Sequence, residues 1–227
     1  MIKFSKHNLN QKTYKDVINV MKSGWLTHGK FTSLFENELK KFTKAKYCTL
    51  VSSCTAALHI SCLALGIKKG DEVIVPAMTH TATAHSAEYT GARVKFADID
   101  YKSGNINIQS FKNLINKKTK AIILVHMAGR SCDMKEIVKI CKSKNIKIIE
   151  DCAHSLGTKY RKKHVGNFGV SGCFSFYPTK QITTGEGGAI ITNHKKYVAK
   201  IRSISNNGMT KPAFKRFENN KYKPWDV

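Results

Sequence analysis

The chain has 227 residues, enough for one large domain or two small ones. Its 41% hydrophobic and 9% aromatic residues are typical of a globular protein and exclude an intrinsically disordered chain. A formal charge of +24 indicates either a polyanionic partner or a generally lysine-rich composition. The second interpretation is favoured, and no nucleic-acid partner is expected, because the basic residues are dispersed and their densest groups lack interleaved aromatic residues.

The seven cysteines lie mostly inside apolar runs, without the paired spacing or accompanying histidines of a zinc site, so no metal is expected. The first residues lack the apolar core of a signal peptide, and no apolar run approaches the length of a membrane span. The expected setting is the reducing cytoplasm, without membrane association.

Short β-rich runs alternate with helical patterns along the chain. Strands are predicted at 47–52, 72–76, 93–98, 120–127, 146–151, 172–177 and 187–192. Helices are predicted at 55–65, 80–90, 107–116, 133–144 and 194–204. This alternation indicates βαβ units, so the predicted fold class is α/β, with a mostly parallel sheet between two helical layers. Ligands of such sheets bind beyond the carboxyl ends of the strands.

Two of these strand ends carry groups suited to a phosphorylated, planar ligand. Ser53 or Thr55 can cap a largely apolar helix whose free N–H groups could bind an anion, although any helix needs such a cap. His80 follows the next strand, where its ring could stack on a planar ligand. The threonines near it, Thr79 and Thr83 among them, can be explained as helix caps alone.

Two carboxylates end the strand predicted at 146–151. Glu150 and Asp151 should face opposite sides of the sheet, so at most one faces a cleft. A buried carboxylate needs a cationic or hydrogen-bonding partner, and the protonated pyridine nitrogen of a cofactor would be one. Capping of the next helix is an equally simple role for the aspartate. His154, taken alone, is more typical of a structural or exposed histidine.

Lys180 lies in FSFYPTKQITTGEGG, between an aromatic strand and a glycine-rich turn. Pro178 ends the strand, so Lys180 lies in the turn beyond it. A lysine held near a buried cleft can act as a nucleophile, although a surface lysine is the usual alternative. An anion-binding helix start, a strand-end aspartate, a stacking ring and a turn lysine are together the groups that pyridoxal 5'-phosphate (PLP) requires, so we expect this cofactor.

Longer motifs extend this interpretation over almost the whole chain. They are SGWLTHG (23–29), the run from SSCTAALHIS to FADID (52–100), HMAGRSCDMKEI (126–137), EDCAHSLGTKY (150–160), GNFGVSGCFSFYPTKQITTGEGGAIIT (166–192) and SNNGM (205–209). With these motifs the chain resembles the DegT/DnrJ/EryC1/StrS family of PLP-dependent sugar aminotransferases, which have the aspartate aminotransferase fold type I.

The resemblance implies a role for each candidate residue. Lys180 would be the catalytic lysine that bonds covalently to the cofactor, and Asp151 would pair with the pyridinium nitrogen. The other cofactor contacts would be His154 at the ring oxygen, Ser175 at the phosphate, Cys54 and Thr55 in the phosphate-binding turn, and His80 as the stacking residue.

Two departures from the family pattern stand out. Cys54 replaces a glycine that is usual in the phosphate-binding turn. The chain also stops at KPWDV (223–227), before the family's Gly-Tyr-Asn segment and most of its C-terminal small domain. We therefore expect an N-terminal arm and helix at 1–30, a PLP-binding large domain at 31–205 and the start of a truncated small domain at 206–227.

The implied reaction transfers an amino group from an amino acid, L-glutamate in the family, to a ketosugar linked to a nucleotide diphosphate. Surface polysaccharide, lipopolysaccharide or amino-sugar biosynthesis is the implied setting, and a homodimer the implied assembly. One alternative is an inactive fragment, or a subunit that needs a separately encoded C-terminal part. Sugar dehydratases of the family have histidine in place of the lysine, so Lys180 disfavours that reaction. A basic nucleic-acid binder ranks last.

Overall fold

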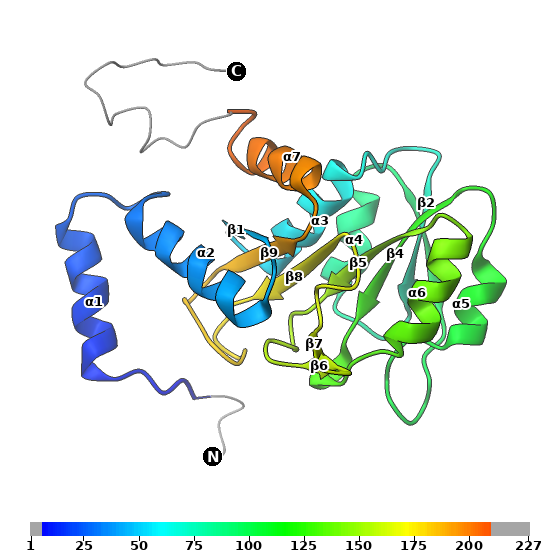
Figure 1. The fold of residues 1–227 in the computed structure, drawn as a ribbon, viewed down its shortest axis with the longest axis horizontal. Helices are drawn as coiled ribbons and strands as arrows, with labels where there is room; N and C mark the ends of the chain where they lie inside the picture. The colour runs from blue at the N-terminus through cyan, green and yellow to red at the C-terminus, as the bar shows by residue number, and fades with distance from the viewer. Residues whose placement is uncertain (1–5, 210–227) are drawn as a thin grey trace.

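A computed structural model describes residues 6–209, in which a seven-stranded sheet lies between two layers of helices (Figure 1). In spatial order the strands are β1 (Tyr47–Val51), β9 (Gly188–Thr192), β8 (Ser171–Ser175), β5 (Lys147–Asp151), β4 (Thr119–Val125), β2 (Glu72–Pro76) and β3 (Arg93–Ala97). The pairs from β8 to β3 are parallel, and β9 is antiparallel to both of its neighbours. The predicted α/β class and the mostly parallel sheet are confirmed.

Helices cover both faces of this sheet (Figure 1). One face carries α3 (Cys54–Ala64), α4 (Thr81–Glu88) and α7 (Lys195–Ser205). The other carries α2 (Lys30–Thr43), α5 (Ile108–Leu114) and α6 (Met134–Ser143). A short 3-10 turn, η1 (Met127–Gly129), follows β4, and a two-stranded hairpin of β6 (Lys159–Tyr160) and β7 (Lys163–His164) lies between β5 and β8.

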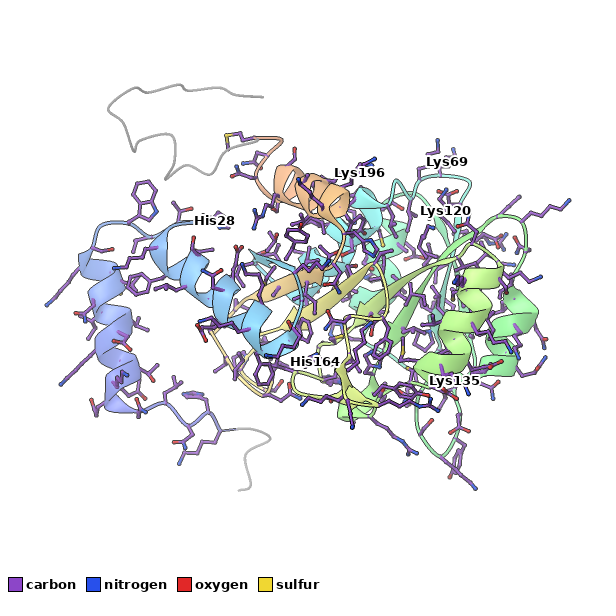
Figure 2. All side chains as sticks on the ribbon, viewed as in Figure 1. His28, Lys69, Lys120, Lys135, His164 and Lys196 are labelled. Atoms are coloured by element: carbon purple, nitrogen blue, oxygen red, sulfur yellow. The ribbon has the colours of Figure 1, made fainter. Side chains whose placement is uncertain are left out.

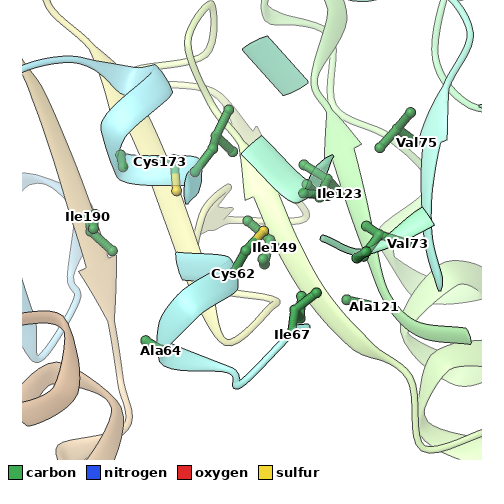
Figure 3. Packing of buried hydrophobic residues seen from close by; sticks show 14 of the residues in the cluster. Cys62, Ala64, Ile67, Val73, Val75, Ala121, Ile123, Ile149, Cys173 and Ile190 are labelled. Carbon is green, nitrogen blue, oxygen red and sulfur yellow. The ribbon is translucent and has the colours of Figure 1, made fainter. Parts of the chain in front are cut away.

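The middle residues of the central strands are apolar because both faces of each strand are buried. In β4, Ala121 and Ile123 pack in the core beneath α3 and α4, whereas Ile122 and Leu124 pack beneath α5 and α6. Figure 3 shows the first of these cores, in which Cys62 of α3 lies close to Ile149 of β5. Successive residues of a central strand therefore reach opposite layers of the molecule.

Strand and helix positions agree with the sequence prediction within about two residues at the strand and helix ends. The strand predicted at 172–177 ends earlier, at Ser175, although the N–H of Phe176 still bonds to the carbonyl of Gly187. Helix α2 and the β6–β7 hairpin have no counterpart among the predicted elements.

Helix α1 (Gln11–Lys22) has no buried residue. Tyr14, Val17, Ile18 and Met21 recur at the spacing of one helix face and are 47% to 64% exposed. Helix α1 falls within the predicted N-terminal arm, but the domain limits at 30 and 205 stay predictions. Residues 210–227, most of the predicted small-domain segment, lie outside the described residues.

Basic side chains are spread over separate elements of the surface. Lys69, Lys120, Lys135 and Lys196 lie on four different segments and are all exposed (Figure 2). The positive charge is therefore spread over several elements of the described surface.

Among residues 6–209, no helix is long and apolar enough to cross a bilayer.

All seven cysteines are unpaired thiols with buried side chains. Burial raises the pKa of Cys62 and of Cys141 to about 12, because a thiolate loses its hydration in an apolar core. These thiols pack as small apolar side chains, as the apolar runs around them predict.

Gly188 is required by a close backbone contact. A Cβ at this position would lie 2.4 Å from the carbonyl carbon of Ser53 and 2.7 Å from the backbone nitrogen of Cys54. We expect Gly188→Ala to lower the free energy of unfolding by about 2 to 3 kcal/mol, measured by urea denaturation.

Gly185→Ala is the matched control, since Gly185 has a φ of +79° and nothing within 4 Å of its Cβ position. It should cost about 1 kcal/mol, for the left-handed backbone alone. Equal losses in the two variants would contradict the close approach at Gly188.

Candidate active site

Asp151 is a buried carboxylate at the carboxyl end of β5, and neutral groups hold it. Its Oδ2 accepts a hydrogen bond from Thr83 Oγ1 at 2.8 Å, and its Oδ1 accepts one from the backbone N–H of Ala153 at 3.1 Å. The side chain forms no ion pair with any residue of 6–209 and is 5% exposed. A buried carboxylate of this kind has a strong electrostatic preference for a cationic partner.

Glu150, the neighbouring residue, faces the opposite layer, as the strand alternation predicts. Its two oxygens accept the backbone N–H groups of Gly166, Phe168 and Gly169 at 2.6 to 2.7 Å. His126 Nε2 donates a fourth bond at 3.1 Å, because its Nδ1 accepts the N–H of Cys132 and so carries no hydrogen. Glu150 therefore ties the 166–169 loop and the end of β4 to β5.

The Glu150 carboxylate also lies close to His126 Nε2 and to the thiol of Cys152, all three being buried. Such a trio has the ligand types of a metal site. Both carboxylate oxygens, however, already accept two N–H groups each. The chemistry of this cluster is that of a structural hydrogen-bond network.

The start of α3 presents two free backbone donors. Ser53, and not Thr55, caps the helix, since its Oγ accepts the N–H of Ala56 at 3.1 Å. Among residues 6–209 no group accepts the N–H of Cys54 or of Thr55. Free N–H groups at the positive end of a helix are suited to a phosphate.

Cys54 occupies the interior of the site. Its Sγ lies 3.9 Å from Asp151 Oδ1. Burial raises the pKa of this thiol well above 9, the Asp151 charge adds to the shift, and Lys180 opposes it. The side chain that replaces the family's usual glycine is therefore a neutral thiol packed against the aspartate.

Ser175, the last residue of β8, lies beside the start of α3. It pairs with Gly188 in the β8–β9 ladder, and Gly188 lies so close to Ser53 and Cys54 that an added Cβ would clash with their backbone. The structure therefore brings Ser175 and the N–H groups of Cys54 and Thr55 to one corner of the sheet. A hydroxyl grouped with helix N–H donors has the chemistry to bind an anion.

Lys180 lies in the turn that follows β8, half-buried. Its backbone N–H bonds to the carbonyl of Tyr177 at 2.9 Å, and the turn returns to β9 through Gly185 and Gly187 at positive φ. The ammonium has no hydrogen bond or ion pair within residues 6–209. The Lys180 charge lowers the pKa of both Cys54 and His154 and the Asp151 charge raises both, so the two charged groups lie near the same two side chains.

His154 and His80 complete the group. Burial lowers the pKa of His154, and the positive charges of Lys180 and His80 lower it further against the opposing effect of Asp151. His154 should therefore be neutral at pH 7. His80 is exposed, and its Nδ1 accepts the N–H of Ala82 at 3.2 Å, which caps α4 and orients the ring.

The structure adds residues to which the sequence assigned no role in the site. Thr83 contacts Asp151 directly and Thr79 contacts Thr83, although both threonines were explained as caps. Gln181 donates from its side chain to the carbonyl of His154 and so joins the two turns. The contacts of Thr83 with Asp151 and of Gln181 with His154 join distant segments of the chain, so no local pattern marks them.

A separate hollow of about 530 Å³ lies over the loops after β3 and β4. It is lined by residues that include Asp100, Asn105, Arg130 and Tyr160. None of the predicted site residues lines it. The predicted site residues therefore lie outside this hollow, at or after the ends of β1, β2, β5 and β8.

The profile of the DegT/DnrJ/EryC1/StrS aminotransferase family matches residues 7–223. The chain belongs to this family. The match includes every candidate residue described above, from Cys54 to Lys180.

Individual relatives agree with this assignment. GDP-perosamine synthase of Escherichia coli O157:H7 is 43% identical over 189 residues, which are 83% of this chain and 52% of that protein. The spore coat polysaccharide biosynthesis protein SpsC of Bacillus subtilis is 38% identical over 212 residues, which are 93% of this chain and 54% of that protein. The chain spans about half the length of the curated relatives it matches.

Among solved structures, the chain is similar to PseC of Helicobacter pylori, an aminotransferase involved in the biosynthesis of pseudoaminic acid. The TM-score is 0.87 at 34% identity, and the match covers 93% of this chain and 57% of that one. This identity and coverage show that nearly all of this chain has the same fold as the matching part of PseC.

The first prediction from this geometry concerns Glu150. In Glu150→Gln, an NH₂ group replaces an oxygen that accepts two N–H groups, whichever way the amide is turned. We expect a loss of about 3 kcal/mol in the free energy of unfolding, measured in urea. Glu38→Gln is the control, since Glu38 is exposed and should change stability by less than about 0.5 kcal/mol. A loss no larger than that of the control would contradict the role of Glu150.

A second prediction concerns His154. Its imidazole should titrate below 6.5 in NMR spectra of the chain, because burial and Lys180 disfavour the charged form. Lys180→Met removes the nearby charge, so the His154 pKa should rise toward its ordinary value. Lys196→Met, on the distant surface of α7, should leave it unchanged. An unchanged pKa in Lys180→Met would show that the ammonium does not face His154.

Proposed function

We propose that this chain is the cofactor-binding part of a PLP-dependent sugar aminotransferase. The observation that carries the proposal is that Asp151 and Lys180 lie near the same side chains without forming an ion pair with each other. A buried carboxylate with neutral partners lies in the same space as a half-buried ammonium without any partner among residues 6–209. The carboxylate is suited to bind a pyridinium nitrogen, and the lysine amine is suited to react with an aldehyde carbon.

The remaining candidates fit the rest of PLP. The N–H groups of Cys54 and Thr55 and the hydroxyl of Ser175 would hold the phosphate at the positive end of α3. His80 would stack on the ring. His154, a neutral imidazole next to Asp151, would contact the ring oxygen. Anionic phosphate, cationic ring nitrogen and electrophilic carbon each find a group of complementary chemistry.

When bound, PLP supplies an electron sink for negative charge at the α-carbon of an amino acid. Asp151 would keep the proton on the ring nitrogen, which that role requires. The Lys180 amine would take the proton from the α-carbon of the amino donor and deliver it to the cofactor carbon that had been the aldehyde. The second half of the reaction would deliver the amino group to the acceptor by the reverse proton movements.

We propose L-glutamate as amino donor and a ketosugar linked to a nucleotide diphosphate as acceptor. The names of GDP-perosamine synthase and of the pseudoaminic acid aminotransferase support a nucleotide-sugar or amino-sugar substrate. SpsC supports a setting in polysaccharide biosynthesis, of which lipopolysaccharide is one case. The charge of +24 would favour approach of the diphosphate.

The cytoplasm is the proposed location, since seven buried free thiols fit a reducing compartment. We propose a homodimer, in which a second copy would supply groups that the described residues do not contain. A separately encoded C-terminal part is a further proposed partner, and co-expression of the chain with such a part would test it.

Two alternative functions are weaker. An inactive fragment is not favoured, because every candidate cofactor-binding residue lies within residues 6–209. The dehydratase reaction of the family is disfavoured by Lys180, since those enzymes have histidine there.

The test of the proposal is covalent capture of the cofactor. Purified chain mixed with PLP should gain a visible absorbance that borohydride removes, leaving the cofactor attached to Lys180 as located by peptide mass spectrometry. Lys180→Ala should lose both signals, because no amine remains at the aldehyde. Lys135→Ala, on the exposed face of α6, should keep them. Attachment at another lysine, or no borohydride-sensitive absorbance in the unchanged chain, would reject the proposal.

A further inference from the structure

Two threonine hydroxyls form a directed chain of hydrogen bonds that ends on Asp151. Thr83, in the first turn of α4, is fully buried, and its Oγ1 lies 2.8 Å from Asp151 Oδ2 and 2.7 Å from Thr79 Oγ1. An ionised carboxylate has no hydrogen to donate, so the hydrogen of Thr83 points to Asp151. Thr79 must then donate to Thr83. The direction of both bonds follows from the chemistry of the groups.

The same bonds leave one acceptor position of the carboxylate open. An ionised carboxylate offers about four such positions, two on each oxygen. Oδ1 receives the N–H of Ala153, and the thiol of Cys54 lies 3.9 Å away as a weak second donor. Oδ2 receives, among residues 6–209, the hydroxyl of Thr83 alone. The unfilled position is therefore on Oδ2.

Rotation of the carboxylate would misplace that position. The terminal torsion of an aspartate has a broad energy minimum, so the side chain alone does not fix the plane of its two oxygens. One bond on each oxygen fixes this plane. Without Thr83, the backbone N–H of Ala153 would be the main remaining constraint.

We infer that Thr83, oriented by Thr79, is a positioning residue that turns the open acceptor position of Asp151 Oδ2 toward the ring nitrogen of the cofactor. The inference rests on the proposed function, because it requires PLP in the site. It goes beyond that function by assigning the selectivity for a nitrogen-containing ring to two hydroxyl groups on a neighbouring helix and loop.

A purely structural role is the competing explanation, since Thr83 also joins α4 to β5. The two roles differ in what they affect. A structural bond supports the whole site, so its loss weakens every ligand that fills the site. A positioning bond acts through Asp151, so its loss weakens only a ligand that uses the ring nitrogen.

The experiment compares two ligands on the full 227-residue chain. They are PLP and 1-deaza-pyridoxal phosphate, in which a C–H group replaces the ring nitrogen. Dissociation constants are measured for both by absorbance titration. The variants are Thr83→Val, which removes the hydroxyl at nearly constant volume, Thr83→Ser, which restores it, and Thr79→Val. Thr90→Val is the matched control, because the Thr90 hydroxyl bonds to Ala87 at the far end of α4.

The unchanged chain should bind PLP more tightly than its deaza analogue. Thr83→Val should weaken PLP about ten-fold and change the analogue by less than about two-fold. Thr83→Ser should restore PLP affinity, and Thr79→Val should give a smaller loss for PLP alone. Thr90→Val should match the unchanged chain.

Equal weakening of both ligands in Thr83→Val, or no weakening of PLP, would overturn the inference. Failure of the proposed function gives a different result, namely no capture of PLP on Lys180 in the unchanged chain. If PLP is captured on Lys180 but Thr83→Val leaves the preference for PLP over its deaza analogue unchanged, the positioning role is rejected and the proposed function stands.

Discussion

The arrangement of the molecule depends on two adjacent carboxylates at the end of its central strand. Because side chains alternate along β5, Glu150 and Asp151 enter opposite layers, and each is buried. A buried negative charge is stable only where donors surround it. The structure meets that requirement in two ways, with four N–H donors on the Glu150 side and a more sparsely bonded carboxylate on the Asp151 side.

The two carboxylates therefore have different roles, since Glu150 stabilises the structure and Asp151 is left to bind a ligand. The saturated carboxylate of Glu150 holds the loop before β8, and β8 in turn ends at Ser175 beside the start of α3. The unsaturated carboxylate of Asp151 retains affinity for a positive group. Because hydrogen bonds on the Glu150 face hold the end of β5 in place, Asp151 can present its charge on the other face without local unfolding. A preorganised site generally requires such support.

Much of this follows from the sequence, and the rest follows from the order of the strands. The apolar runs at 120–127 and 146–151 are sufficient to predict buried strands, and alternation is sufficient to place Glu150 and Asp151 on opposite faces. The contact of Thr83 with Asp151 is different, since it joins residues 68 positions apart through the neighbourhood of α4 and β5. Its threonine is locally indistinguishable from a helix cap. Helix α2 was not predicted from the sequence either. Only two of its residues, Leu39 and Thr43, are buried.

The reactivity of the seven buried cysteines depends on whether the chain is folded. Thiol reagents attack thiolates that they can reach, and these sulfur atoms are enclosed in the cores on both sides of the sheet. Their modification must therefore wait for the sheet and its helices to separate. Once a single adduct forms, the enlarged side chain cannot return to its close-packed place, so oxidation or alkylation of the opened chain would make a transient opening permanent.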